Sequence, residues 1–275
     1  MKIFDAHCDT LSAGFDLGRG AGQFDTQRAI ARGGGVQVMA AFGADQEGQL
    51  RRLSGYVTDC REALERGALA LIPALEGGDA VTSLEDAERL IGLGVRFFGL
   101  TWNNDNALGG GCLGSSGLTA LGRGVTELCE NRGVTVDLAH ASKQTFWDVL
   151  NRAKRPPAVT HACAETLRAH MRNLDDSQLR ALGERGGVVG ITFYVPFLTD
   201  TPSLAFDALI AHFRHAVSIA GEDAVGIGSD FDGCDALPPG LEDTSRLPAL
   251  IERLPFPGRI KDKIAYGNFR RLITE

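Results

Sequence analysis

Eight short apolar runs, each about the length of a buried strand, recur along this 275-residue chain. Most of them are rich in valine, isoleucine, leucine and phenylalanine, and several follow a glycine, which is typical of parallel strands buried on both faces. The predicted strands are Lys2–Asp9, Gly35–Phe42, Ala68–Leu75, Val95–Trp102, Gly133–His140, Ala158–Cys163, Gly187–Tyr194 and Ala224–Asp230. This recurrence predicts one large parallel sheet.

Amphipathic segments fill many of the intervals between the predicted strands. Their apolar residues recur at spacings of three and four, which indicates helices with one buried face. The predicted helices are Asp45–Arg66, Ser83–Leu93, Gly122–Asn131, Lys143–Arg152, Asp175–Glu184 and Ser203–Ile219. Alternating strands and helices form βαβ units, and eight strands in a chain of this length favour a closed barrel over a doubly wound open sheet. We therefore expect an α/β fold with a single (β/α)8 TIM barrel domain over residues 1–275.

The composition of the chain argues against several classes of protein. Hydrophobic residues make up 44% of the chain and charged residues 23%, so a large core can form. The net charge of −7 argues against a nucleic-acid binder. We find no signal segment, no run of about 18 apolar residues, and no CxxC spacing among the six cysteines. We expect a cytoplasmic protein with reduced thiols and with no nucleic-acid or membrane partner.

Histidines and carboxylates stand at the ends of five predicted strands. In a TIM barrel the C-terminal ends of the strands form one rim, and the catalytic residues lie there. The residues at these ends are His7, Asp9, Glu76, His140, His161 and Asp230. Imidazole nitrogen and carboxylate oxygen are common ligands of zinc and similar divalent ions. The sequence therefore predicts a metal centre at the mouth of the barrel.

The first predicted ligands are weak evidence when each is taken alone. His7 and Asp9 are two residues apart on a strand, so their side chains point to one face, but a polar pair at the rim has the same spacing. Glu76 ends an apolar strand and precedes Gly77 and Gly78, which suits a carboxylate that bridges two ions. An exposed loop acid is the alternative interpretation of Glu76.

The remaining candidates are two histidines for a second ion and an aspartate that joins His7 and Asp9 at the first. His140 and His161 end consecutive strands, although two hydrogen-bonded histidines at the mouth would show the same pattern. Asp230 ends the last strand, where it can hold an ion and exchange a proton with the attacking water. A lysine is the alternative residue for the bridging position between the two ions, but no lysine ends a predicted strand. We therefore assign the bridging position to Glu76. Together these residues predict two adjacent ions that lower the pKa of a shared water.

Seven motifs, in order along the chain, resemble those of the renal (membrane) dipeptidase family, which are zinc peptidases among the amidohydrolase-like barrels. The motifs are Asp5-Ala6-His7-Cys8-Asp9-Thr10, Leu75-Glu76-Gly77-Gly78, Asp137-Leu138-Ala139-His140, Val159-Thr160-His161, Arg172-Asn173-Leu174, Gly228-Ser229-Asp230-Phe231-Asp232-Gly233 and Gly267-Asn268-Phe269. Each motif is modest alone, and the ordered set is highly specific. The resemblance implies a TIM-barrel metallo-dipeptidase that acts on small peptides, and it suggests a homodimer.

The resemblance also implies a role for each matching residue. The implied zinc ligands form two sets that share one residue: His7, Asp9 and Glu76 for one ion, and Glu76, His140 and His161 for the other. Asp230 would be a metal ligand and the catalytic acid and base, and Glu76 the second catalytic residue. Arg172 matches the arginine that binds the C-terminal carboxylate of the substrate, a role that suits its forked guanidinium group.

One departure from the family pattern concerns substrate binding. The family often has Leu-Thr-His after the fourth strand, whereas this chain has Leu100-Thr101-Trp102-Asn103. Trp102 cannot carry a charge, although its indole N–H can donate one hydrogen bond. We assign Trp102 and Asn103 to substrate binding, and we expect the change to alter which substrates are preferred.

The predicted function is hydrolysis of dipeptides, including those with a D-residue at the C-terminal position, by water activated at two zinc ions. A related metal-dependent hydrolase of another small amide, a lactam or an ester is one alternative. A non-catalytic binding protein that keeps the barrel is another, but a carrier has no need to retain every metal ligand.

Overall fold

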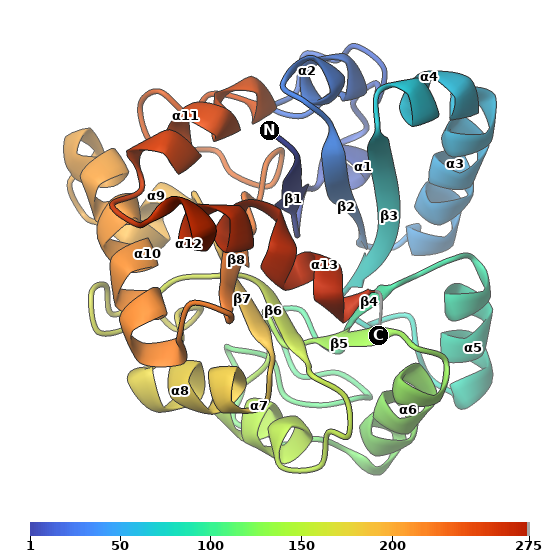
Figure 1. Cartoon of the computed structure of the whole chain (residues 1–275). Helices are drawn as coiled ribbons and strands as arrows, with labels where there is room; N and C mark the ends of the chain where they lie inside the picture. The colour runs from blue at the N-terminus through green and yellow to red at the C-terminus, as the bar shows by residue number, and fades with distance from the viewer. Residues whose placement is uncertain (274–275) are drawn as a thin grey trace.

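The strands of the chain close into a parallel barrel, which Figure 1 shows at the centre of the molecule. The computed structural model describes residues 1–273, and in it each strand pairs with the next along the chain while the last pairs with the first. The strands are β1 (Ile3–Asp5), β2 (Gly35–Phe42), β3 (Leu69–Glu76), β4 (Phe97–Gly99), β5 (Thr135–Asp137), β6 (Ala158–Ala162), β7 (Val188–Ile191) and β8 (Val225–Ile227). The predicted (β/α)8 barrel is confirmed.

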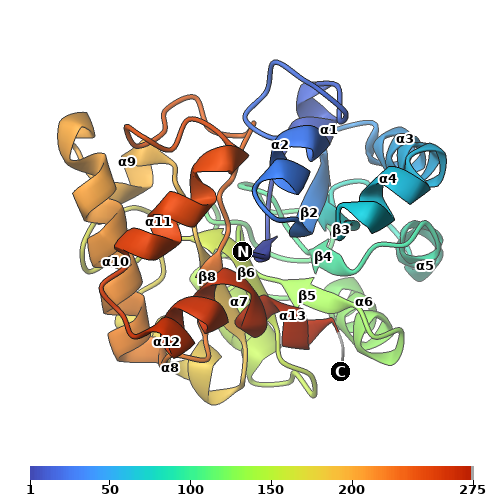
Figure 2. The same cartoon turned by 45° about the horizontal axis from the view of Figure 1, so that its top comes forward.

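Helices surround the barrel, as Figures 1 and 2 show. In chain order they are α1 (Thr10–Ala13), α2 (Thr26–Ala31), α3 (Gln46–Asp59), α4 (Arg61–Arg66), α5 (Leu84–Gly92), α6 (Ala120–Asn131), α7 (Lys143–Leu150), α8 (Asp176–Glu184), α9 (Val195–Leu198), α10 (Ala205–Ala220), α11 (Leu247–Arg253), α12 (Gly258–Asp262) and α13 (Asn268–Leu272). Short 3-10 turns lie at Pro202–Leu204 and Thr244–Arg246, and a π-helical turn lies at Lys263–Gly267. Among residues 1–273, no helix is both long and apolar enough to cross a lipid bilayer.

Polar side chains determine where several helices begin. Ser83 caps α5 and Asp175 caps α8, and in each helix the side chain three positions later accepts a hydrogen bond from the backbone N–H of the cap residue. The helix predicted at 45–66 is two helices in the structure, because Cys60 leaves the helical conformation between α3 and α4. Most predicted strands extend beyond the observed ones, since the backbone turns into the mouth loops earlier than the apolar pattern indicates.

Apolar side chains form a layer on each side of the sheet. Phe97 and Phe98 are neighbours on β4, point to opposite faces and belong to different buried clusters. Phe97 lies 6.4 Å from Phe4 of β1, measured between ring centroids. Because β1 and β4 are not adjacent strands, this contact crosses the interior of the barrel. The smaller cluster therefore fills the barrel, and the larger one packs the strands against the helices.

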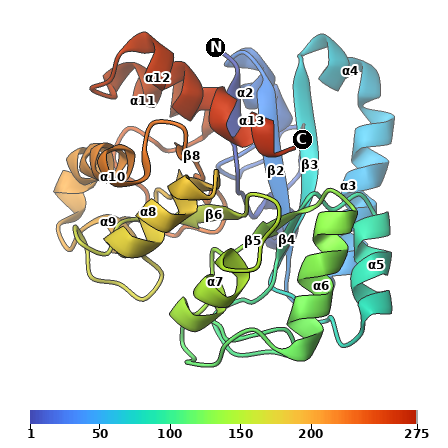
Figure 3. The same ribbon diagram turned by 60° about the horizontal axis from the view of Figure 1, so that its bottom comes forward.

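The C-terminal helix α13 crosses one end of the barrel in Figures 1 and 3. Its Phe269 stacks on Phe4 with 5.6 Å between ring centroids and meets Phe97 edge-on at 6.4 Å. Gly226 of β8 faces the Phe269 ring so closely that a Cβ atom there would lie 2.5 Å from it. These contacts close the end of the barrel where the strands begin.

We expect Phe269→Ala to lower the free energy of unfolding by about 3–5 kcal/mol, since it removes a buried ring from the closed end and leaves a cavity. Urea unfolding of the metal-free protein measures the change. Leu204→Ala, at a position that is 54% exposed, should stay within about 0.5 kcal/mol of the parent. A loss below about 1 kcal/mol for Phe269→Ala would show that α13 does not anchor the barrel.

Candidate active site

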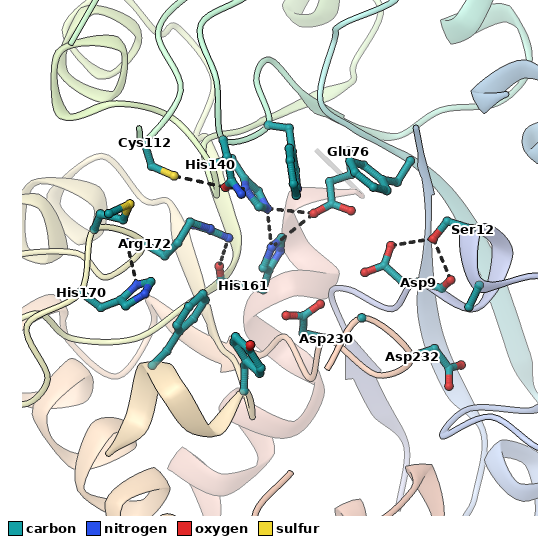
Figure 4. Close-up of a pocket in the computed structure, with 18 residues that line it drawn as sticks. Asp9, Ser12, Glu76, Cys112, His140, His161, His170, Arg172, Asp230 and Asp232 are labelled. Carbon is teal, nitrogen blue, oxygen red and sulfur yellow. Dashed lines mark hydrogen bonds and ion pairs between the residues drawn. The ribbon is translucent and has the colours of Figure 1, made fainter. Parts of the chain in front are cut away.

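A cavity of about 660 Å³ opens at the C-terminal ends of the strands, within the size range of small-ligand sites. Figure 4 shows the side chains that line it. The predicted site residues among them are Asp9, Glu76, Trp102, Asn103, His140, His161, Arg172 and Asp230. His7 is buried beside them and only 2% exposed. The structure thus gathers every predicted metal ligand at one end of the barrel.

Backbone pairing beyond the ends of β1 and β8 brings the first ligands together. The N–H of Asp9 donates to the carbonyl of Phe231 at 2.8 Å, and the N–H of Asp230 donates to the carbonyl of His7 at 3.2 Å. Asp230 has a φ of +63°, in the left-handed region that few residues other than glycine adopt. This turn directs its carboxylate into the cavity, whereas Cys8 points away into the core, as strand alternation predicts.

The imidazole of His7 is surrounded by three carboxylates. Its Nε2 atom lies 3.5 Å from Asp9 Oδ2, 3.6 Å from Glu76 Oε2 and 4.0 Å from Asp230 Oδ1. Among the described residues this buried nitrogen has no hydrogen-bond partner. Ligands held at about 2.1 Å from a tetrahedral zinc ion stand about 3.4 Å apart, so the spacing fits an ion within the group.

The carboxylates around His7 and His7 itself form the first group of predicted ligands, and the second group consists of His140, His161 and Glu76. Both imidazoles of the second group have an unprotonated Nε2 nitrogen. His140 Nδ1 donates to Asn103 Oδ1 at 2.9 Å, and His161 Nδ1 lies 3.0 Å from the Thr160 hydroxyl. A neutral imidazole that is protonated on Nδ1 has only a lone pair on Nε2. The two Nε2 atoms nevertheless lie 2.9 Å apart, and that of His140 is 2.8 Å from Glu76 Oε1. Three acceptors facing one another at these distances fit a shared cation.

Glu76 connects the two groups. Its Oε1 faces the histidines of the second group, and its Oε2 faces His7. The side-chain amide of Gln46 donates to the carbonyls of Glu76 and Gly77 at 3.1 and 2.7 Å, which holds the end of β3 in place. A carboxylate with one oxygen toward each group has the arrangement that a bridging ligand needs.

The charges in the site shift the pKa values of its residues in opposite directions. Burial lowers the pKa of His7, but the carboxylates of Glu76 and Asp9 outweigh it and hold that pKa well above its ordinary value. Burial lowers the pKa of His140 to about 4. Burial, reinforced by neighbouring carboxylates, raises the pKa of Asp9 to about 6 and that of Asp230 to about 8. The excess of buried negative charge therefore favours the binding of cations.

Arg172 lies on one side of the cavity, and Asp9 and Ser12 lie on the opposite side (Figure 4). Its guanidinium group donates to the carbonyls of Ala139 and His161, and its Cζ lies 5.6 Å from the ring centre of Phe197. The cavity is consequently cationic at one side and acidic at the other, a polarity that matches a zwitterionic ligand.

Trp102 and Asn103 both line the cavity but make different contacts. The Trp102 ring packs against Phe42 at 5.0 Å and against His140 at 6.0 Å between centroids, and so forms an apolar wall. Asn103 Oδ1 accepts hydrogen bonds from His140 Nδ1 and from Cys112 Sγ, the latter at 3.2 Å. The contact that Asn103 makes in the structure therefore orients His140, a predicted metal ligand.

Two contacts at the site were missed in the sequence. One is the hydrogen bond from His140 to Asn103, and the other is the hydroxyl of Thr160, which also lies 2.5 Å from Asp137 Oδ2. The sequence offered one signal for Thr160, its position directly before the predicted ligand His161. Regular strand alternation, however, places neighbouring side chains on opposite faces and so predicts that Thr160 points away from the site.

Comparison with known proteins identifies the family. The sequence pattern of the membrane dipeptidase family, peptidase family M19, matches residues 35–275. The chain belongs to this family. It is therefore one of the metallo-dipeptidases, hydrolases that act on peptide bonds, and the predicted resemblance is confirmed.

Relatives of this dipeptidase family member are found in bacteria and yeast. An uncharacterized protein in the pqqA 5′ region of Klebsiella pneumoniae is 34% identical over 257 residues, which cover 86% of this chain and 93% of that protein. An uncharacterized dipeptidase of Schizosaccharomyces pombe is 38% identical over 195 residues, 67% of this chain and 47% of the yeast protein. The aligned part thus spans about half of the yeast relative.

Solved structures of similar proteins share the barrel. A metallo peptidase from Rhodobacter sphaeroides, liganded with a phosphinate mimic of the dipeptide L-Ala-D-Ala, is 24% identical with a TM-score of 0.85, covering 99% of this chain and 98% of that one. An amidohydrolase from Pseudomonas aeruginosa is 21% identical with a TM-score of 0.85, covering 99% and 95%. At this identity the likeness shows the fold.

Metal binding at pH 7 should release at least about one proton per chain. In the metal-free protein His7 and Asp230 have raised pKa values, so both hold protons at that pH, and a metal ion can bind only the deprotonated forms. The release should shrink as the pH rises past about 8, where Asp230 has lost its proton. Calorimetric titration with zinc in buffers of different ionisation enthalpy measures it, and identical heats in all buffers would contradict the pKa pattern.

Proposed function

We propose that this dipeptidase works with two divalent ions, preferably zinc, and that it accepts dipeptides with a D-residue at the C-terminal position. The observation that carries the two-ion proposal is the division of the ligands into two groups that share Glu76. Each group offers imidazole nitrogen and carboxylate oxygen, the donors that zinc prefers. When bound, such a pair of ions lowers the pKa of water and polarises the target carbonyl.

Asp230 is suited to move the proton of the reaction. Its carboxylate reaches into the cavity beside Asp9 and His7, and burial with the neighbouring carboxylates raises its pKa to about 8 in the metal-free protein, which favours uptake of a proton there. We assign it the uptake of a proton from the attacking water and the return of that proton to the leaving amine. Glu76 holds the two ligand groups at a fixed separation during this exchange.

Arg172 is suited to bind the free carboxylate of the substrate. It lines the cavity, is 6% exposed, and its orientation is held by the backbone carbonyls of Ala139 and His161. The acidic side of the cavity, at Asp9, then lies where the free ammonium group of a dipeptide would be. Trp102 supplies an apolar wall at the position where the family often has histidine, so we assign it to side-chain selection and not to charge stabilisation.

Support for a D-residue at the second position comes from a relative. The Rhodobacter sphaeroides peptidase with the same fold was solved with a mimic of L-Ala-D-Ala. We propose that the present chain also accepts a D-residue at this position. The cytoplasmic location and the homodimer stay predictions.

Hydrolysis of a panel of mixed dipeptides, with L- or D-residues at the second position, tests the proposed function. We expect cleavage that is lost with a chelator and restored by zinc, at two ions per chain. Steady turnover of N-acyl amino acids or lactones without dipeptide cleavage would favour the alternative hydrolase. Absence of any turnover with well under two ions bound would favour the non-catalytic binding protein.

Replacement of Arg172 should remove selectivity for a free carboxylate. We expect Arg172→Met to lower kcat/KM for a dipeptide by about 30-fold or more, since a buried charge pair with the substrate is lost. The same variant should lose much less activity toward the corresponding dipeptide amide, which has no carboxylate to bind. Arg168→Met is the matched control, because Arg168 pairs with Asp200 outside the cavity.

Equal losses on the acid and on the amide would show that Arg172 acts only through its contacts with the backbone. In that case the ratio of the two kcat/KM values would be the same in Arg172→Met as in the parent.

A further inference from the structure

Thr160 of β6 lies below the cavity and contacts a histidine of each ligand group. Its hydroxyl oxygen is 3.0 Å from Nδ1 of His161 and 3.5 Å from Nδ1 of His7. The rings of these two histidines contact each other at 3.8 Å between centroids, with their planes tilted by 39°, although they belong to different groups of predicted ligands. Thr160 is 0% exposed and does not line the cavity, so it cannot touch a substrate. Any effect it has on the site must act through the histidines.

The direction of these hydrogen bonds follows from the donors around Asp137. Its Oδ1 accepts the backbone N–H groups of Thr160 and Ala139 at 2.9 and 3.1 Å. Its Oδ2 therefore accepts the single hydroxyl proton of Thr160 at 2.5 Å. The lone pairs of the hydroxyl oxygen are then left to accept a hydrogen bond from the Nδ1–H of His161. This arrangement keeps the His161 proton on Nδ1. Its Nε2 is then unprotonated and faces His140 and Glu76.

An irregularity in the sheet puts Thr160 in this place. Neighbouring residues of a regular strand point to opposite faces, yet Thr160 and His161 both face the interior of the barrel. The pairing of β6 with β7 shifts register within 159–162, and such a bulge redirects side chains. The carbonyl of Thr160 is also enclosed by Gly190 and Gly228, where a Cβ atom would lie 2.1 and 1.8 Å from it. The position of Thr160 is consequently fixed by backbone packing.

We propose that Thr160 is a positioning residue whose hydroxyl, held by Asp137, orients His161 and His7 with Nε2 toward the two ions. The inference rests on the proposed two-ion centre, but not on the reaction that this centre performs. A hydrogen bond to the far nitrogen of a metal-binding histidine typically changes metal affinity by about 10–100-fold.

Four variants test the proposal. Thr160→Val keeps the shape of the side chain and removes the hydroxyl, and Thr160→Ser keeps the hydroxyl. Asp137→Asn reverses the hydrogen bonds: the backbone N–H groups hold the amide oxygen at the Oδ1 position, so the amide NH2 donates to Thr160 and the hydroxyl proton turns toward His161. Thr126→Val is the matched control, because Thr126 is a buried threonine that bonds only within α6.

The readouts are zinc affinity, measured by competition with a chromogenic chelator, and the His161 tautomer, measured by ¹⁵N NMR of the metal-free protein. We expect Thr160→Val and Asp137→Asn to weaken zinc binding by about 10–100-fold, with Thr160→Ser and Thr126→Val within about threefold of the parent. We also expect the His161 proton on Nδ1 in the parent and on Nε2 in Asp137→Asn. Urea unfolding of each metal-free variant verifies that it is folded, and Asp137→Asn decides the matter if Thr160→Val does not fold.

Parent-like zinc affinity in Thr160→Val and Asp137→Asn would overturn the proposal, as would an equal loss in Thr126→Val. Neither readout involves a peptide. A chain that binds zinc as expected but cleaves no dipeptide would contradict the proposed function and leave the role of Thr160 supported.

Discussion

Three carboxylates buried around one imidazole cannot all remain ionised unless positive charge lies among them. Asp9, Glu76 and Asp230 surround Nε2 of His7 at 3.5–4.0 Å, in a part of the molecule that water hardly reaches. In the metal-free protein protons supply part of that charge, which is why the pKa values of His7 and Asp230 are raised. Divalent ions can supply more of it. Glu76, which has one oxygen toward each group of predicted ligands, and Arg172 at the cationic side of the cavity are both arranged around these buried charges.

The barrel brings these buried charges together because it places residues that are distant in sequence on one rim. Closure of β8 against β1 brings Asp230 beside His7 and Asp9, and the backbones stay paired beyond both strands. The opposite end is sealed by Phe269 of α13, which stacks on Phe4. A rigid, closed base and a polar mouth together allow buried charges to be held at fixed distances, which a flexible loop could not do.

Much of this arrangement could be predicted from the sequence, because burial leaves a pattern. The apolar runs located every strand, and the histidines and acids at their ends lie together at the mouth of the barrel, where their assignment as metal ligands stays a prediction. The helices α1, α2, α9 and α11 to α13 were missed, since each has seven residues or fewer and so shows no sustained apolar spacing. The contacts of Thr160 and Asn103 with the histidines were missed for another reason: each depends on where one side-chain oxygen points, and for Thr160 the bulge in β6 also breaks the regular alternation of side chains.

Anomalous diffraction from crystals grown with zinc tests the central claim most directly. Two peaks about 3.5–4 Å apart are expected, one among His7, Asp9 and Asp230 and the other at His140 and His161, with Glu76 reaching both. A single peak, or peaks away from these side chains, would contradict a pair of ions joined by a shared carboxylate.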